Sequence, residues 1–369
     1  MASSETIEPP PGPGPESTPP EGPFIRWERV PWEAVAYLAL IAVAVAMRMW
    51  DLGARAYHYD ETIHAFDSWV LFQGGGYIHS PWSHGPFLYE LAAGGFFLFG
   101  DNLVAPRIFP ALFGAVLVAM PLLLRSNLGR WGALATAAIL AFSPSLLYFA
   151  RFDRADILTV VFDLGVVIAL WRFIATRSTR YLYVAAILLA LSFSSKETAF
   201  ISLLALGSFL AAWWARSWLP IAWSRMPHKL LRLRGAFTPS RLPPHGVFLL
   251  VIVALTLPLF AAAVGVMVDW FPGELGLVNL SESDSAGRVG APVGGTAAFV
   301  AAGIITGVLF IASAVLGALW QPKTFFIAFG TFFAIYFLLH TTFLTNMVGM
   351  GTGVWQSLGY WIAQQPVER

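Results

Sequence analysis

The sequence contains no cysteine and little charge, with Asp, Glu, Lys and Arg making up 12% of its 369 residues. The lack of cysteine excludes disulfides, thiolate metal sites and a cysteine nucleophile. Neither a P-loop nor a Gly-x-Gly-x-x-Gly motif occurs, so nucleotide hydrolysis is not supported as an energy source. Soluble chains carry roughly twice this fraction of charge. Hydrophobic residues instead make up 57% of the chain and its mean hydropathy is +0.68, so most of it is predicted to lie in lipid.

Repeated long apolar stretches predict an all-α polytopic membrane protein. About nine transmembrane helices are expected, at residues 33–50, 104–124, 131–149, 157–176, 181–195, 198–216, 246–267, 297–319 and 324–344. The 86–99 stretch is short for a span and contains Glu90, so we expect an interfacial helix there. Residues 1–24 hold eight prolines and no apolar periodicity, which predicts a disordered cytoplasmic tail before a transmembrane domain at 25–369.

The distribution of Lys and Arg predicts the orientation of the chain in the membrane. If residues 86–99 do not cross, fourteen of the 22 Lys and Arg lie on one side, many of them in the loop at 217–245. The positive-inside rule makes that side cytoplasmic, and it makes the first loop, 51–103, extracytoplasmic at the cell membrane. The basic 217–245 loop is then more typical of anchoring to anionic lipid than of a nucleic-acid site.

The first outer loop carries an adjacent carboxylate pair, Asp60 and Glu61, and four of the seven histidines. Residues 60–69 have the spacing of an amphipathic helix lying on the membrane. The two carboxylates could act as a general base and a cation ligand, or as ordinary acids that complement the start of a helix. Asp60 and His64 are four residues apart and could chelate one ion, although no two-histidine metal motif occurs.

Two further charged motifs lie between apolar stretches. The first contains Arg151, Arg154 and Asp156, which could bind phosphate and orient it or hold a divalent ion. Its alternative reading is an interfacial charge cluster. The second, Lys196 and Glu197, lies in a short turn, where the lysine could contact phosphate or snorkel to the interface. All three motifs are predicted on the extracytoplasmic face, which favours one shared site.

These residues resemble the GT-C superfamily, and within it the branch of protein O-mannosyltransferases and lipid A aminoarabinose transferases. The likeness lies in the Asp-Glu pair of the first outer loop, in Gly-Pro-Phe-Leu-Tyr at 85–89 and in Ala-Pro-Arg at 105–107. Four motifs are closer still to a prokaryotic subfamily of flippase-activity-associated proteins, at residues 59–65, 142–146, 151–156 and 195–197. The resemblance covers about residues 33–365.

The resemblance implies an inverting transfer of a sugar from a polyprenyl-phosphate donor to a glycan, lipid or protein acceptor on the extracytoplasmic face. Asp60 and Asp156 match the catalytic acids of the first and second outer loops, with Glu61 beside the first. A divalent cation held by Asp60 and Asp156 is an open option. The expected substrate-binding residues are Arg151, Arg154, Lys196, Glu197, His64 and His84.

Two alternatives to a transferase remain. A lipid-linked-sugar flippase or its accessory would bind the same phosphate without needing a base, and an inactive fragment could serve as an assembly partner. Members of the subfamily continue with further spans beyond residues 359–367, so we expect this chain to be truncated relative to them.

Overall fold

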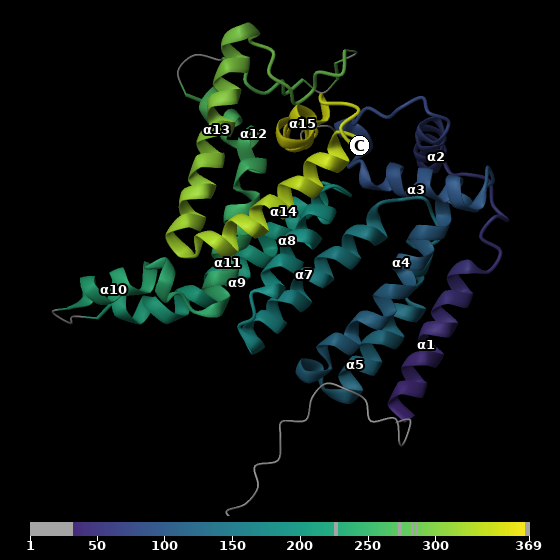
Figure 1. Ribbon diagram of the computed structural model, residues 1–369, viewed down its shortest axis with the longest axis horizontal. Coiled ribbons are helices and arrows are strands. Elements are labelled where there is room, and N and C mark those ends of the chain that lie inside the picture. Colours follow the sequence, from purple (N-terminus) through teal and green to yellow (C-terminus); the bar gives the residue numbers. More distant parts are fainter. Residues whose placement is uncertain (1–31, 225–227, 272–274, 282, 285, 366–369) are drawn as a thin grey trace, which may run out of the picture.

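The computed structural model describes residues 32–224, 228–271, 275–281, 283–284 and 286–365 (Figure 1). Within these ranges every regular element is helical and no strand occurs, so the predicted all-α class is confirmed. The predicted tail at 1–24 lies outside the described residues.

Seven described segments are long and apolar enough to cross a membrane. They are Trp32–Met49 (α1), Ala105–Phe142 (η2 at Ala105–Arg107, α4 at Ile108–Ala119, η3 at Met120–Leu124 and α5 at Arg125–Phe142), Asp156–Thr176 (α7), Thr198–Ala222 (α9), Pro244–Asp269 (α11 at Pro244–Thr256, η5 at Leu257–Phe260 and α12 at Ala261–Asp269), Gly295–Trp320 (α13) and Pro322–His340 (α14). The chain is therefore a polytopic membrane protein, as predicted.

The difference from nine predicted spans arises at two places. The segment Ala105–Phe142 contains two predicted spans, because Gly129, at φ 70°, interrupts the helix and lets α5 pack back against α4 (Ile108–Ala119) and α1. The predicted span 181–195 is the 14-residue helix α8 (Arg180–Phe193), which is shorter than the seven but packs against both α7 and α14.

Several hydrophobic cores hold the described helices together, and two of them show the same use of alanine. One joins α7, α8, α9, α11 and α14, and the other joins α1, α4 and α5. In the first, Ala185, Ala186 and Ala190 of α8 are fully buried, and these small side chains allow neighbouring helices to approach closely. In the second, Ala133, Ala137 and Ala141 of α5 play the same part.

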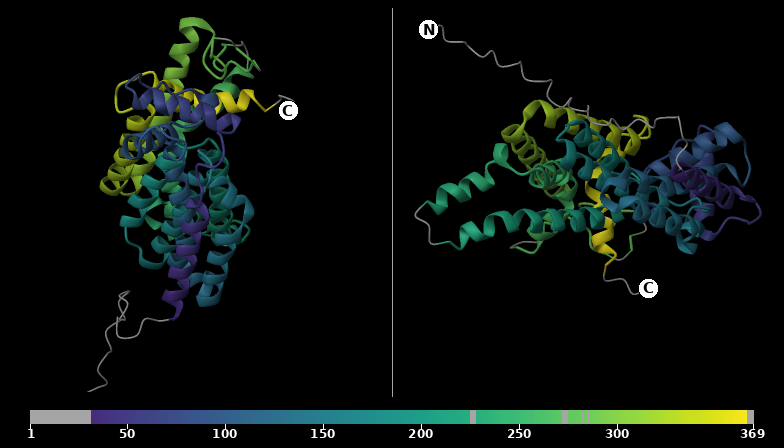
Figure 2. Two further views of the ribbon diagram at one scale, coloured as in Figure 1. Left: turned by 90° about the vertical axis from the view of Figure 1, so that its right-hand side faces the viewer. Right: turned by 90° about the horizontal axis from the view of Figure 1, so that it is seen from below.

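Short helices lie across one end of the bundle (Figures 1 and 2). They come from the first loop, as α2 (Tyr59–Phe72), η1 (Pro81–Ser83) and α3 (Phe87–Phe99), and from the C-terminal part, as α15 (Gly349–Gly351), η6 (Thr352–Gln356) and α16 (Ser357–Ala363). We call this the site end. The helix α9 begins there, runs about 37 Å at 1.5 Å per residue, and is followed by α10 (Lys229–Phe237).

Candidate functional site

The first loop is tied to the turn between α8 and α9 by its backbone. The amide of Gly85 donates to the carbonyl of Ser195 at 3.3 Å, and the amide of Phe87 donates to that of Ser194 at 2.9 Å. A Cβ atom at Gly85 would lie 2.2 Å from the Ser194 carbonyl oxygen, so only glycine permits this approach. The contact places His84 beside the Lys196–Glu197 motif.

Four charged side chains form a continuous chain of ion pairs at the site end. Arg154 Nη1 lies 2.7 Å from Asp60 Oδ2, and Arg154 Nε lies 3.2 Å from Asp156 Oδ2. Lys196 Nζ lies 2.6 Å from Asp156 Oδ1. Segments almost 140 residues apart in the sequence therefore meet through two carboxylates and two cations, and the side chain of Asp60 is 39% exposed.

A pocket of about 560 Å³ opens beside this chain of ion pairs. Its polar wall is made of Arg154, Lys196, Glu197 and His84, whose Nδ1 lies 2.8 Å from Glu197 Oε2. The His84 ring stacks on Trp361 of α16 at 5.2 Å between centroids. The remaining wall is mostly apolar, from α9 and α16, so the pocket suits a ligand with a charged and an apolar part. We call it the polar pocket.

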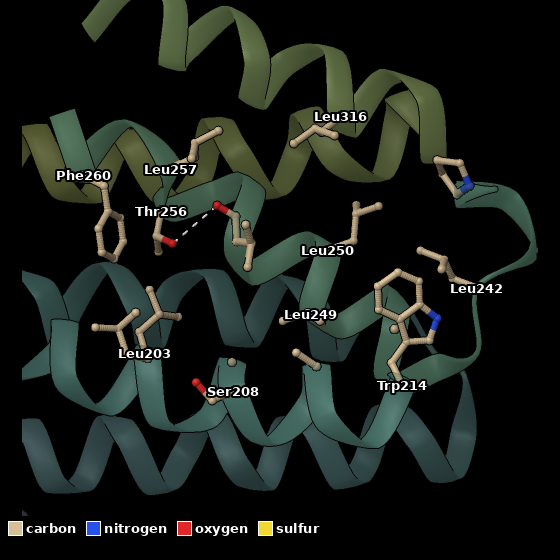
Figure 3. Close-up of a pocket in the computed structure, with 16 residues that line it drawn as sticks. Leu203, Ser208, Trp214, Leu242, Leu249, Leu250, Thr256, Leu257, Phe260 and Leu316 are labelled. Carbon is tan, nitrogen blue, oxygen red and sulfur yellow. Dashed lines mark hydrogen bonds between the residues drawn. The ribbon is translucent and has the colours of Figure 1, made fainter. Parts of the chain in front are cut away.

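An apolar cavity of about 610 Å³ continues along α9 (Figure 3). It lies between α9 and α11, with Leu316 of α13 on one side and Trp214 at the far end. Leu204 lines both this cavity and the polar pocket, and Phe200 of the pocket packs edge-on against Phe260 of the cavity, 5.3 Å between centroids. The two hollows therefore share a boundary.

The side chain of Glu61 makes different contacts from that of its neighbour Asp60. Its side chain is fully buried, and Arg107 donates to both of its oxygens at 2.8 Å. Burial alone would raise the pKa of Glu61, but the hydrogen bonds from Arg107 and from the amides of His58 and Asp153 outweigh it and hold the pKa below its ordinary value. These contacts describe a charged anchor between the first loop and η2.

Asp153 and His64 are buried beside this anchor. The carboxyl group of Asp153 has no hydrogen-bond partner among the described residues, and burial raises its pKa well above the ordinary value. His64 Nδ1 contacts the carbonyl of Asp153 at 2.8 Å, and burial lowers the pKa of the imidazole. The predicted role of His64 in substrate binding stays a prediction, but the structure places its ring in the interior.

Arg151 points away from the ion pairs. Its Nη1 donates to the carbonyls of Met47 and Arg48, at the end of α1, and Nη2 donates to that of Asp51. Arg154 and Lys196 contact carboxylates at the site, whereas Arg151 contacts these backbone carbonyls. The contacts of Arg151 do not test its predicted role in binding the donor. That role stays a prediction.

A divalent cation at Asp60 and Asp156 fits this arrangement poorly. Arg154 bridges the two carboxylates, and no cluster of three or more potential ligands (His, Cys, Asp or Glu) occurs in the described part of the chain. A cation between these two acids would have to displace the guanidinium of Arg154.

The geometry defines a polytopic helical membrane protein with a charged site at the mouth of an apolar cavity. Residues 83–229 match the family model of dolichyl-phosphate-mannose-protein mannosyltransferases, so about two fifths of the chain is similar to a family of membrane glycosyltransferases. The match includes His84, Arg154, Asp156 and Lys196, whereas Asp60 precedes it. No curated protein and no solved structure gives a significant match. The narrower likeness to one subfamily has no support here and stays a prediction.

Sequence reasoning missed Arg107 and Trp361 as parts of this region. Arg107 makes five hydrogen bonds, two to Glu61 and the others to the carbonyls of Leu52, Arg55 and Ala56. An arginine at the start of an apolar segment was a signal for it, because such a charge needs a partner. For Trp361, 277 residues beyond His84, no local pattern gives a comparable signal.

Proposed function

We propose that the chain is a membrane glycosyltransferase that moves a sugar from a polyprenyl-phosphate donor to an acceptor at the extracytoplasmic face. The supporting observation is the junction of the polar pocket, which carries Arg154 and Lys196, with the apolar cavity along α9. Such a junction matches an amphiphile with a phosphate at the head of an isoprenoid tail. The similarity to a mannosyltransferase family over residues 83–229 supports the same reaction class.

In this proposal the tail lies between α9 and α11, in the cavity of Figure 3. The donor phosphate contacts Arg154 and Lys196, which also neutralise the charge on the polyprenyl phosphate as it leaves. Asp60 takes the proton from the acceptor hydroxyl. The hydroxyl oxygen attacks the anomeric carbon from the side opposite the donor phosphate. The bond from that carbon to the phosphate oxygen breaks, and inversion follows.

The test is transfer by the full-length chain in liposomes that contain a radiolabelled polyprenyl-phosphate sugar. Asp60→Asn keeps size but removes the proton acceptor, and we expect at least about a 10²-fold loss of transfer with donor binding little changed. Lys196→Met should weaken donor binding and turnover together. Asp67→Asn, on the same helix but outside the ion pairs, is the matched control.

Near-normal transfer by Asp60→Asn would remove this residue from the mechanism. The alternative, a flippase or an accessory without transfer activity, is favoured by one observation: Asp60 is engaged by Arg154 in the described arrangement. Wild-type protein that binds or flips the donor but transfers no sugar to any acceptor would support that alternative.

A further inference from the structure

A second polar pocket lies at the site end, lined in part by residues that are close in the sequence to His84 and Trp361. It has a volume of about 420 Å³ and is walled by three segments, the turn before His84, the loop before α13, and η6 with α16. Its lining includes Ser80, Trp82, Asp284, Gln356 and Tyr360. None of them belongs to the ion pairs or to the polar pocket.

Hydrogen bonds and close packing fix the walls of this second pocket. Gln356 Nε2 donates to the carbonyls of Gly287 and Val289, at 2.9 and 2.8 Å, which ties η6 to the loop before α13. A Cβ atom at Gly290 would lie 2.1 Å from the amide nitrogen of Tyr360, so a glycine is needed for α16 to approach this loop. These contacts hold two of the pocket's walls together.

The carboxylate of Asp284 is also held in place. Its Oδ1 accepts from the amide of Ala286 at 2.8 Å, and its Oδ2 accepts from Asn279 Nδ2 and Arg288 Nε at 3.2 Å each. The side chain is 13% exposed and lines the pocket. A fixed carboxylate of this kind is ready to accept hydrogen bonds from ligand hydroxyls.

The chemistry of the walls matches a neutral sugar. Trp82 is 52% exposed, and Tyr360 of α16 also lines the pocket, so two aromatic side chains border it and could pack on the apolar face of a pyranose. Ser80 and Asp284 supply a hydroxyl and a carboxylate, and Gln356, whose Nε2 is bonded to Gly287 and Val289, supplies its amide oxygen. Asp284 is the one charged side chain among the described residues that line the pocket, so this lining offers no cationic side chain to an anionic ligand.

The position of the pocket suits the second substrate of a transfer reaction. Trp82 precedes His84 by two residues. Tyr360 directly precedes Trp361, and the ring centroids of Tyr360 and Trp361 lie 5.4 Å apart. His84 and Trp361 both line the polar pocket, so the same two segments of the chain contribute neighbouring residues to both pockets. Resting on the proposed function, we propose that the second pocket is the acceptor subsite and that the acceptor is a neutral glycan.

The test measures binding of neutral disaccharides, with maltose and cellobiose as probes, to the full-length chain in nanodiscs by saturation-transfer difference NMR. We expect saturation transfer to at least one probe for the wild-type protein, and at least a tenfold weaker affinity for Trp82→Ala and for Asp284→Asn. Trp82→Phe keeps an aromatic ring and should retain more of the binding. Trp270→Ala removes a tryptophan that is 73% exposed but outside the pocket, and it should bind as wild type.

Binding of the polyprenyl-phosphate donor by each variant shows that it is folded. Absence of saccharide binding by wild-type protein, or equal binding by Trp82→Ala, would refute the proposal. Trp82-dependent binding of a Ser/Thr-containing peptide in place of the saccharides would refute the glycan assignment.

The acceptor proposal and the proposed function can fail separately. If transfer occurs and Trp82→Ala leaves the acceptor KM unchanged, the acceptor subsite is wrong and the transferase stands. If saccharide binding depends on Trp82 but no sugar is ever transferred, the pocket stands and the transferase does not. Where both hold, Trp82→Ala should raise the acceptor KM at least tenfold with little change in the donor KM.

Discussion

Removal of the charge should lower the stability of the protein strongly at Glu61 and hardly at all at the adjacent Asp60. Glu61→Gln leaves the guanidinium of Arg107 buried, at 3% exposure, without a compensating charge. Breaking a buried ion pair by removing one partner costs about 3–5 kcal/mol. The Asp60–Arg154 pair is partly exposed, and such pairs contribute about 0–1 kcal/mol, so Asp60→Asn should leave stability almost unchanged.

Thermal unfolding of the two variants in nanodiscs measures this contrast. With about 2–4 °C of Tm per kcal/mol, Glu61→Gln should lower Tm by roughly 6–20 °C, and Asp60→Asn by at most a few degrees. The double variant Glu61→Gln with Arg107→Gln removes both charges and should recover part of the loss. A Glu61→Gln protein as stable as the wild type would refute the anchor role drawn from these contacts. Loss of transfer without loss of stability would support the predicted catalytic role of Glu61, which stays a prediction.

Three further predictions concern orientation, pH and metal. Single cysteines in place of Gln73 and Ser126, both exposed in this cysteine-free chain, should place the first loop outside and residue 126 inside; an impermeant maleimide that labels position 126 but not 73 in intact cells would reverse the topology. Burial raises the pKa of Glu90 from 4.5 to about 9. Below pH 4.5 the group is protonated in the folded and the unfolded protein, and stability is full. The free energy of unfolding then falls as pH rises towards 9, by on the order of 3 kcal/mol near pH 7. Glu90→Gln should therefore raise Tm at pH 8 and not at pH 4, and equal pH profiles of Tm for the two proteins would contradict this. If a divalent cation acts between Asp60 and Asp156, EDTA should abolish transfer and Mg²⁺ or Mn²⁺ should restore it, whereas transfer at the full rate in EDTA would exclude that cation.

The helical class, the apolar segments and the short helix within 86–99 follow from composition and periodicity, because lipid leaves few alternatives to helices. The number of spans was harder to predict. Whether Gly129 reverses the chain depends on how α5 packs on α4 and α1, which no local pattern encodes. The position of the 14-residue α8 in the bundle likewise follows only from its contacts with α7 and α14.

The site residues divide by the direction in which their side chains point. Asp60 and Glu61 are consecutive on α2, so their side chains diverge by about 100° around the helix axis, and only packing decides which one faces the interior. Arg151 and Arg154 lie in an irregular turn and point to different partners, the end of α1 and the two aspartates. Sequence spacing placed all four in one region but could not assign their contacts. The amide of His58 donates to Glu61 at 3.0 Å, a helix-start contact that the position of Glu61 could have suggested.

The ion pairs themselves indicate how a resting site would be converted to a reactive one. Arg154 holds Asp60 and Asp156 together, and Lys196 holds Asp156, so two negative and two positive charges are balanced without a ligand. A donor phosphate that enters the polar pocket competes with both carboxylates for these cations, and it presents its oxygens in the fork geometry that a guanidinium favours. Transfer of Arg154 from Asp60 to the phosphate would leave the carboxyl group of Asp60 without its partner and beside the bound donor. Under the proposed function, the general base therefore becomes available only when the donor is in place, and a vacant site keeps its carboxylate engaged.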